Sequence, residues 1–309
     1  MGISSFKTGS MKRSFLAGNA AYIPVGSRGI FAGGHASGNV IEYVDIATTG
    51  NATDFGDLTQ TKQTTAPGAS STRGLFSGGY TGASSNVIEY ITIASTGNAT
   101  DFGDLLEESY ANGGCSNSTR AIIAGGTGDG TRIQYVTINT LGNATDFGDL
   151  TASATNLAGC ASTTRGIFGA PSGGAVIDYV TIATTGNATS FGNLSVTRVA
   201  IGSCSSSTRG LFTGGNNGAT YVNIIDYITI ATTGNATDFG DLTVSRGYTA
   251  SCSSETRGLT GAGYTGSESS NVIDYVTIAS TGNAIDFGDL TGARYGLSAL
   301  SNSHGGLAA

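Results

Sequence analysis

Apolar and polar positions along the chain recur with a period of 44 to 48 residues. Each period holds four short segments rich in Val, Ile, Tyr, Phe and Thr, separated by Gly, Asn and Ser, which is the chemistry of β-strands and turns. The best-preserved phrase, Gly-Asn-Ala-Thr-Asp-Phe-Gly-Asp-Leu, starts at Gly50, Gly97, Gly142, Gly186, Gly234 and Gly282, with GNATSFGNL in the fourth copy and Ile285 in the sixth. Internal repetition at this period indicates an array of like units.

Four strand types follow one another in each period, and we label them a to d. Strand a is variable, as in 243–252, and strand b reads Ser-Thr-Arg-Gly-Leu-Phe-x-Gly-Gly, as in 71–79. Strand c is the nearly continuous apolar run Val-Ile-Glu-Tyr-Ile-Thr-Ile at 87–93, and strand d contains Asp-Phe-Gly-Asp. The glycine density and the absence of a 3.6-residue apolar stripe argue against helices.

Four short strands per repeat and six repeats predict an all-β fold, a six-bladed β-propeller of four-stranded blades. The pattern resembles the kelch repeat family over residues 26–309, with a Gly-Gly pair ending one strand and an aromatic residue in the next. A phenylalanine stands where kelch repeats usually carry tryptophan, at Phe55, Phe102, Phe147, Phe191, Phe239 and Phe287.

Counting strands predicts how the ring closes. Strands b, c and d each occur six times, whereas strand a occurs only five times between repeats. The sixth copy is the C-terminal tail, where GARYGLSALSNSHGG aligns with VSRGYTASCSSETRG. We therefore expect the tail to complete the first blade, which leaves 1–25 as an extended N-terminal arm and 26–309 as the propeller. A closed ring has no unpaired sheet edges between its blades.

Composition and charge narrow the function. The net charge of -7 disfavours nucleic-acid binding, and no apolar run reaches the roughly 18 residues of a membrane span. Repeat positions account for 15 of 21 acids, since ten lie in Asp-Phe-Gly-Asp and five precede the repeat tyrosine. We expect the repeat acids and arginines to pair, or to bond turn backbone, within or between blades.

No nucleophile, base and acid set appears, so we expect no enzyme activity, no catalytic residue and no cofactor. His35 lies in a loop, and His304 is interpreted as a substitute for the repeat arginine. Two aspartates three residues apart supply too few ligands for calcium, so no metal site is predicted.

The four cysteines each precede a repeat arginine by five residues, at Cys115, Cys160, Cys204 and Cys252. They are therefore equivalent positions in different blades, too far apart for disulfides. We expect them to be small buried residues, with Gly68 in the second copy and Ala299 in the tail at the corresponding positions.

Loops of variable length on one face are the usual binding surface of repeat proteins. The connections between strands b and c vary most, and they contain Tyr80, Tyr221 and Tyr264, with Asn216 and Asn217 beside one of them. Tyrosine among Asn, Ser and Gly suits a host-surface glycan or a protein. Plain solvated turns are the alternative interpretation.

The N-terminal segment FKTGSMKRSFLAGNAAYIP resembles the short leader on virion proteins of marine tailed phages, especially those infecting cyanobacteria. The repeat phrase is also similar to proteins of such viruses. The resemblance implies that the arm attaches the chain to other virion proteins in multiple copies per particle, through Phe6, Lys7, Lys12, Arg13, Phe15, Leu16, Asn19 and Tyr22.

By this resemblance the chain is a non-enzymatic virion protein whose propeller acts as a tail- or fibre-associated adhesion module. Capsid decoration is a close alternative. A cellular kelch-like scaffold for protein partners is a third possibility, and a propeller lyase or glycosidase is the fourth.

Overall fold

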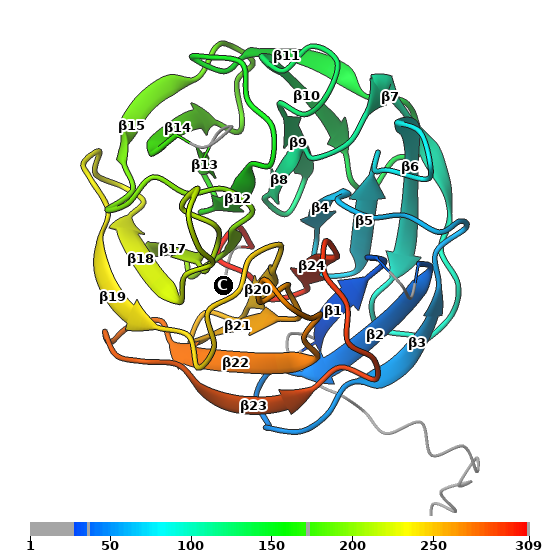
Figure 1. The fold of residues 1–309 in the computed structure, drawn as a ribbon. Coiled ribbons are helices and arrows are strands. Elements are labelled where there is room, and N and C mark those ends of the chain that lie inside the picture. The colour runs from blue at the N-terminus through cyan, green and yellow to red at the C-terminus, as the bar shows by residue number, and fades with distance from the viewer. Residues whose placement is uncertain (1–27, 36–37, 171–173, 308–309) are drawn as a thin grey trace, which may run out of the picture.

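The computed structural model arranges the chain as six sheets of four antiparallel strands, set like blades around a central axis (Figure 1). It describes residues 28–35, 38–170 and 174–307. No helix occurs within these ranges, and the predicted six-bladed β-propeller is confirmed.

Each blade runs from an innermost strand a to an outermost strand d. Blade 1 consists of β24 (Ser298–Ser301), β1 (Arg28–Ala32), β2 (Val40–Asp45) and β3 (Thr53–Asp57). Blade 2 consists of β4 (Ala66–Ala69), β5 (Arg73–Ser77), β6 (Ser85–Thr92) and β7 (Thr100–Ser109). Blade 3 consists of β8 (Gly113–Ser116), β9 (Arg120–Ala124), β10 (Arg132–Thr137) and β11 (Thr145–Asp149).

The remaining blades follow the same order. Blade 4 consists of β12 (Ala158–Ala161), β13 (Arg165–Gly169), β14 (Val176–Thr181) and β15 (Thr189–Asn193). Blade 5 consists of β16 (Gly202–Ser205), β17 (Arg209–Thr213), β18 (Ile224–Thr229) and β19 (Thr237–Asp241). Blade 6 consists of β20 (Ala250–Ser253), β21 (Arg257–Gly261), β22 (Val272–Thr277) and β23 (Ile285–Asp289).

The C-terminal strand closes the ring as predicted. β24 pairs with β1 over four residues, from Gly29 opposite Ser301 to Ala32 opposite Ser298. Beyond this pairing, the backbone N–H of Arg28 donates to the side-chain oxygen of Asn302 at 3.0 Å. The equivalent turn uses a serine in four other blades, such as Ser70 with Arg73 at 3.1 Å, and Asn117 in blade 3. Asn302 therefore forms the a–b turn contact in blade 1, although strands a and b of this blade come from opposite ends of the chain.

The repeated Asp-Phe-Gly-Asp phrase forms a bulge that the next blade fills. In blade 1, Ile41 pairs with Gly56 and Glu42 with Asp54, so Phe55 is the extra residue and turns into the core. A Cβ on Gly56, whose φ is +147°, would lie 2.5 Å from the carbonyl oxygen of Gly97 in blade 2. Only glycine permits this approach.

The Gly-Asn pair of the following repeat docks on this bulge. The N–H of Gly97 donates to the Phe55 carbonyl at 2.8 Å, and the Asn98 side chain accepts from the Asp57 N–H at 3.0 Å. The same asparagine contact joins every neighbouring pair of blades around the ring. The most regular phrase in the sequence is thus explained by blade-to-blade bonding.

The repeat arginines also join blades, through backbone rather than through carboxylates. Arg73 lies over the ring of Tyr90 in its own blade, 4.6 Å from the centroid, and donates to the Ile138 carbonyl of blade 3 at 2.8 Å. All six blades repeat this arrangement. Each repeat tyrosine in turn contacts the phenylalanine of its d strand, as Tyr43 does with Phe55 at 6.1 Å.

Buried ion pairs are formed by a second set of basic residues, which lie in the d–a connections. Arg198 pairs with Asp226 at 3.0 Å, and Arg246 with Asp274 at 3.0 Å. The expected pairing of acids and arginines, or their bonding to turn backbone, is therefore confirmed. Blade 1 uses Arg294 with Glu42 at 2.7 Å, where burial raises the pKa of the carboxyl although Arg294 acts to lower it.

Blade 2 replaces the arginine of this pair with lysine. Lys62 lies 2.7 Å from Glu89, and both side chains are fully buried. Lys62 and Arg246 each follow a strand-d leucine by four residues. The sequence alone therefore indicates that the two basic residues are equivalent. In blade 3 the acid is replaced by Gln134, which accepts from the Leu106 N–H at 2.9 Å.

The cysteines are buried and unpaired, as predicted. A Cβ on Gly166 of blade 4 would lie 2.8 Å from Cys115 Sγ of blade 3, so each thiol packs against the strand-b glycine of the next blade. Gly68 occupies this position in blade 2, as expected. The assignment of Ala299 is wrong by one residue, because Leu300 pairs with Ile30 as Cys252 pairs with Leu259.

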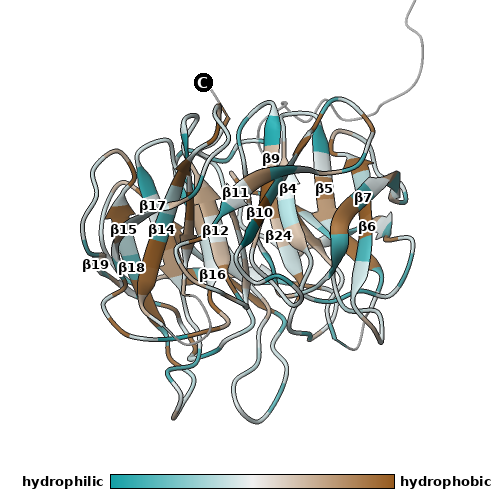
Figure 2. Cartoon of the chain, turned by 90° about the horizontal axis from the view of Figure 1, so that it is seen from above, coloured by the Kyte–Doolittle hydropathy of each residue, from teal (hydrophilic) through white to brown (hydrophobic). Residues whose placement is uncertain are grey.

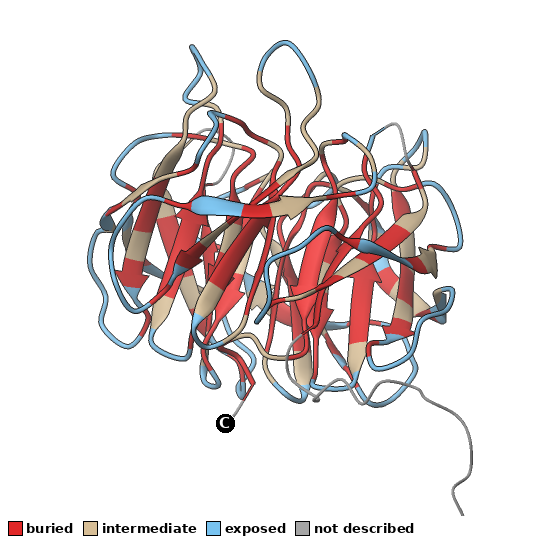
Figure 3. Cartoon of the chain, turned by 90° about the horizontal axis from the view of Figure 1, so that it is seen from below, coloured by how far each residue is buried: buried red, intermediate tan, exposed pale blue. Residues whose placement is uncertain are grey.

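The core lies between blades rather than in one central mass. Six clusters of buried apolar side chains fill the ring, each joining strands of adjacent blades. Figure 3 shows buried residues along the strands and exposed residues at the connections. Figure 2 shows the same division in hydropathy, with the apolar residues concentrated in the strands.

Candidate binding surface at the mouth of the central channel

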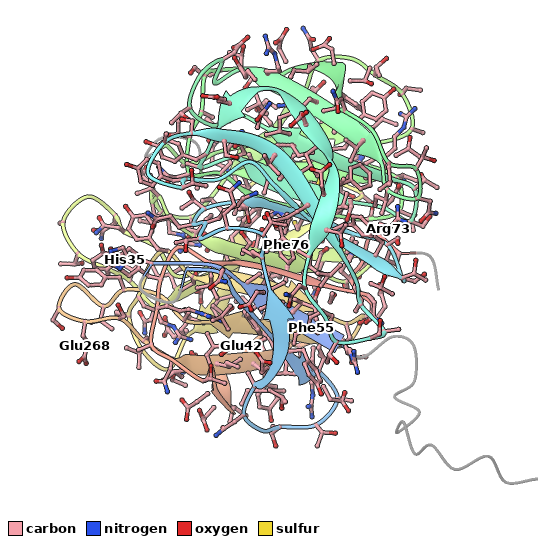
Figure 4. All side chains as sticks on the ribbon, turned by 90° about the vertical axis from the view of Figure 1, so that its right-hand side faces the viewer. His35, Glu42, Phe55, Arg73, Phe76 and Glu268 are labelled. Atoms are coloured by element: carbon pink, nitrogen blue, oxygen red, sulfur yellow. The ribbon has the colours of Figure 1, made fainter. Side chains whose placement is uncertain are left out.

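The two ends of the propeller axis differ in their connections. We call the end formed by the b–c and d–a connections the loop face, and the opposite end the tail face, because the C-terminal residues cross it. Two long connections project from the loop face in Figure 3. Figure 4 shows His35 and Glu268 together at this end.

The tyrosines outside the strands are unevenly distributed between the two faces. Of 13 tyrosines, Tyr22 lies outside the described residues, and one in each blade is the strand-c tyrosine under the repeat arginine. All the others lie in b–c or d–a connections and hence on the loop face: Tyr80, Tyr110, Tyr221, Tyr248, Tyr264 and Tyr295. No packing requirement of the repeat explains them, because other copies have His, Gln, Thr, Asn, Ser, Ala, Val or Gly there.

A collar of backbone hydrogen bonds rings the mouth of the channel. One residue of each d–a connection is left-handed, with φ between 54° and 67°. At five of the six positions its N–H donates to the carbonyl of the equivalent residue in the preceding blade, as Thr64 does to Gly296 at 2.7 Å and Gly296 to Tyr248 at 2.9 Å. The six positions are Thr64, Ala111, Asn156, Ala200, Tyr248 and Gly296.

Four tyrosines and a histidine meet beside this collar, over blades 5, 6 and 1. Tyr264 lies 5.6 Å from Tyr221 and 5.3 Å from Tyr295, measured between ring centroids. His35 stacks on Tyr295 at 4.8 Å with an interplanar angle of 13°. Tyr248 lies 5.9 Å from the same ring. We call these five residues the aromatic strip.

The strip is held in place by its own backbone. Tyr221 lies between two glycines of blade 6, since a Cβ on Gly247 would be 2.9 Å from its ring and one on Gly266 would be 3.2 Å away. Burial raises the pKa of the Tyr221 hydroxyl, and nearby Tyr248 acts in the same direction, while a hydrogen bond with Asn216 opposes them. The Tyr221 ring is therefore packed against blade 6 on both sides.

Only some of the predicted loop residues lie close to one another in the structure. It brings Tyr221 and Tyr264 together and leaves Tyr80 apart, where Tyr80 contacts Tyr110 at 5.2 Å and is 37% exposed. Asn216 and Asn217 shape their loop, because their side-chain oxygens accept from Gly218 at 2.7 Å and Thr220 at 2.9 Å.

Sequence reasoning missed the residues that complete the site. His35, Tyr110, Tyr248 and Tyr295 come from other connections, and three of them lie in the segments interpreted as strand a. A signal was present, because Tyr248 and Tyr295 lie within two residues after Arg246 and Arg294, in the d–a connections that lead to blades 6 and 1.

The channel is a narrow cavity open at the loop face. Its volume is about 140 Å³, and small residues of the six inner strands line it. Serine side chains join neighbouring inner strands, as Ser205 does by donating to the Ala161 carbonyl at 2.7 Å. Such a space holds a few water molecules.

The tail closes the other end. Gly305 donates to the Ser205 carbonyl of blade 5 at 2.9 Å, and His304 Nε2 lies 3.0 Å from the Ala69 carbonyl of blade 2. These blades stand opposite one another, so the tail crosses the axis. Arg28, and not His304, occupies the repeat-arginine position of blade 1, which corrects the interpretation of His304 as a substitute for it.

His304 approaches a serine without forming a catalytic pair. Ser116 Oγ lies 3.4 Å from His304 Nε2, but it donates to the Ala69 carbonyl at 2.9 Å. His304 Nδ1 accepts from the Gly306 N–H at 3.1 Å, so Nε2 carries the proton and cannot take one from serine. Within the described ranges no group of three or more His, Cys, Asp or Glu residues could hold a metal ion.

The predicted attachment arm, residues 1–25, lies outside the described residues. In the part of the chain that the structure covers, no helix is long and apolar enough to cross a membrane. Neither the protein-family models nor the curated proteins compared with this sequence match it. The fold defines a β-propeller, a scaffold that suggests an interaction or adhesion module.

Proposed function

We propose that this chain is a non-enzymatic recognition module that binds its ligand on the loop face. The observation that carries the proposal is the position of the six tyrosines that the repeat does not require, all of them around the channel mouth. Tyrosine gives large contact area at a small cost in side-chain entropy, which is why it is common in binding surfaces.

A non-enzymatic role is supported by the uses of the charged side chains. Arg198, Arg246, Arg294 and Lys62 are buried in ion pairs, and the repeat arginines bond backbone. Four of the six acids outside the repeat, Asp45, Glu107, Asp129 and Glu255, also have local structural partners. Asp45 accepts from Ala47 at 3.1 Å, and Glu255 accepts from Ser207 at 2.9 Å.

We further propose that the module is displayed on the virion of a tailed phage, attached through the N-terminal arm. The arm sequence and the repeat phrase support this through their resemblance to virion proteins of marine phages. The geometry is compatible with display, because β1 begins with Arg28 at the tail face and leads to His35 at the loop face. A chain held by its N-terminal segment would present the tyrosines outward.

Deleting residues 1–24 tests the attachment. The shortened protein retains every strand of the propeller, and we expect it to fold but to be lost from particles. Normal incorporation of the shortened protein would overturn the attachment role.

Alanine at Tyr80, Tyr221 or Tyr264 separates adhesion from decoration. If the module mediates adhesion, particles that carry at least one of these variants should adsorb to the host more weakly. Capsid decoration instead predicts normal adsorption with altered particle stability. A cellular scaffold predicts capture of a protein partner through the same face with no link to particles.

A further inference from the structure

We infer that the aromatic strip binds an uncharged oligosaccharide. This inference rests on the proposed function and adds the chemical class of the ligand and its position on the loop face. It commits to the strip over blades 5, 6 and 1, and it excludes the separate Tyr80–Tyr110 pair from the main site.

The arrangement of the rings favours a sugar. The rings of Tyr221 and Tyr264 are inclined at 80° and those of Tyr264 and Tyr295 at 54°, whereas His35 stacks on Tyr295 at 13°. Together they form a stepped wall of faces and edges. A pyranose has C–H groups that carry partial positive charge, and these are attracted to the negative face of an aromatic ring.

Polar groups beside the strip match hydroxyls. The flanking connections of blades 5 and 6 carry Asn216, Asn217, Thr265, Ser267 and Ser269. Amide and hydroxyl groups can both donate and accept hydrogen bonds, as sugar hydroxyls do. Glu268 is the one acid in these two connections, and it is exposed.

The distribution of cations argues against an anionic ligand. The structure describes 11 basic residues, Lys62 and ten arginines, and none is free at the strip. Four are buried in ion pairs, and six bond backbone of the next blade. The last, Arg132, pairs with Glu107 at 3.2 Å and Asp129 at 3.4 Å in blade 3. Arginine and lysine are the strong charged donors to phosphate, sulfate and carboxylate groups, and neither lies at the strip.

The strip is also a poor match for a protein partner. Protein interfaces bury roughly 800 Å² per partner around protruding aromatic or arginine anchors. Every tyrosine of the strip is partly buried, and among the tyrosines that the structure describes only Tyr80, which lies outside the strip, is exposed, at 37%. A fixed, shallow surface of ring faces suits a weakly held polymer bound by many copies at once.

An array of defined oligosaccharides tests the inference with the full-length chain as the probe. The array carries uncharged glucose-, mannose- and galactose-based chains beside sialylated and sulfated ones. We expect binding to uncharged members, with affinity then measured by titration calorimetry on the best of them. Binding confined to the anionic members, or to none of the sugars, would overturn the inference.

Substitutions in the aromatic strip test where on the loop face the ligand binds. Tyr264→Ala and Tyr295→Ala should each weaken binding by about tenfold or more, which corresponds to the loss of one good contact. Tyr264→Phe keeps the ring and should retain most of the affinity, which separates stacking from a fold defect. Tyr80→Ala is the matched control on the same face and should bind normally.

Two failures are distinguishable. If no sugar binds but loop-face variants still abolish host adsorption, the ligand is a protein, and the proposed function survives without this inference. An equal loss with Tyr80→Ala would overturn the assignment of the strip as the main site.

Discussion

A Cβ built on Gly68 would lie 2.7 Å from the Cβ of Ala121, across the interface between blades 2 and 3. At the other five interfaces the pattern is reversed, with a cysteine or Leu300 facing a strand-b glycine, as Cys115 faces Gly166. A small residue on one blade is thus matched by a larger one on its neighbour.

Placing a cysteine at position 68 should destabilise the protein when Ala121 remains. We expect Gly68→Cys to cost about 1–3 kcal/mol of unfolding free energy, because the new side chain has no space. The double variant with Ala121→Gly restores the pattern of the other blades and should recover about 1 kcal/mol or more. Chemical denaturation of the single and double variants measures this coupling, and simple additivity would contradict it.

Removing only the cation of the blade 2 ion pair should destabilise the protein more than removing both of its charges. Lys62→Met leaves Glu89 buried without its cation, and we expect a loss of about 3–5 kcal/mol. Changing Glu89 to Gln in the same background imitates blade 3, where Gln134 accepts a backbone N–H without any cation. The double variant should therefore be more stable than Lys62→Met, as judged by its denaturation midpoint.

The tail should detach more easily in acid. Burial lowers the pKa of His304 below its ordinary 6.5, although the Ala69 carbonyl and Glu255 act to raise it. The folded state therefore favours neutral imidazole, so its contribution is complete above pH 6.5 and declines as pH falls from there toward the lowered pKa. Thermal midpoints measured between about pH 8 and pH 5 should fall less for His304→Gln than for the parent chain.

The four thiols should be inert in the native protein. Burial raises the pKa of Cys115 and of Cys204 to about 12, so the reactive thiolate is nearly absent at neutral pH. Alkylation by iodoacetamide, followed by mass spectrometry, should label none of the four before unfolding and all of them after it. Rapid labelling of the folded chain would contradict the burial of these side chains.

Two truncations of the C-terminus should behave differently. Removing 298–309 deletes β24, exposes the edge of β1 and should prevent stable folding. Removing only 303–309 leaves the ring closed but uncovers one end of the channel, and we expect a loss of about 1–3 kcal/mol, since the buried Leu307 and the contact of His304 with Ala69 are removed. Circular dichroism during heating distinguishes the two results.

The repeat made the scaffold predictable from sequence, whereas the site depended on contacts that repetition does not encode. Phe55 and Gly56 recur in every copy because each blade needs the same bulge, so blade number, strand order and closure followed from counting. The one-residue error at Ala299 arose where the tail departs from the repeat. Pairing of β24 with β1 fixes the register there, and spacing from an arginine does not.

Two of the five residues of the aromatic strip were predictable for a similar reason. Tyr221 and Tyr264 stand in connections of visibly variable length, so they were identified. His35 and Tyr295 come from opposite ends of the chain and meet only because the ring closes. Their stacking at 4.8 Å follows from the tertiary structure alone.

The same closure determines how the molecule would carry a mechanical load. Force applied N-terminal to Arg28 enters the propeller at β1, which leads directly to His35, while β24 beside it is preceded by Tyr295 and Gly296. Pulling between a tether and a ligand held by Tyr295 would therefore load the short β1–β24 pairing of blade 1, whereas a ligand held by His35 would load β1 along its own backbone. In the first case the shear strength of four paired residues would limit how hard the module could be pulled before it opened.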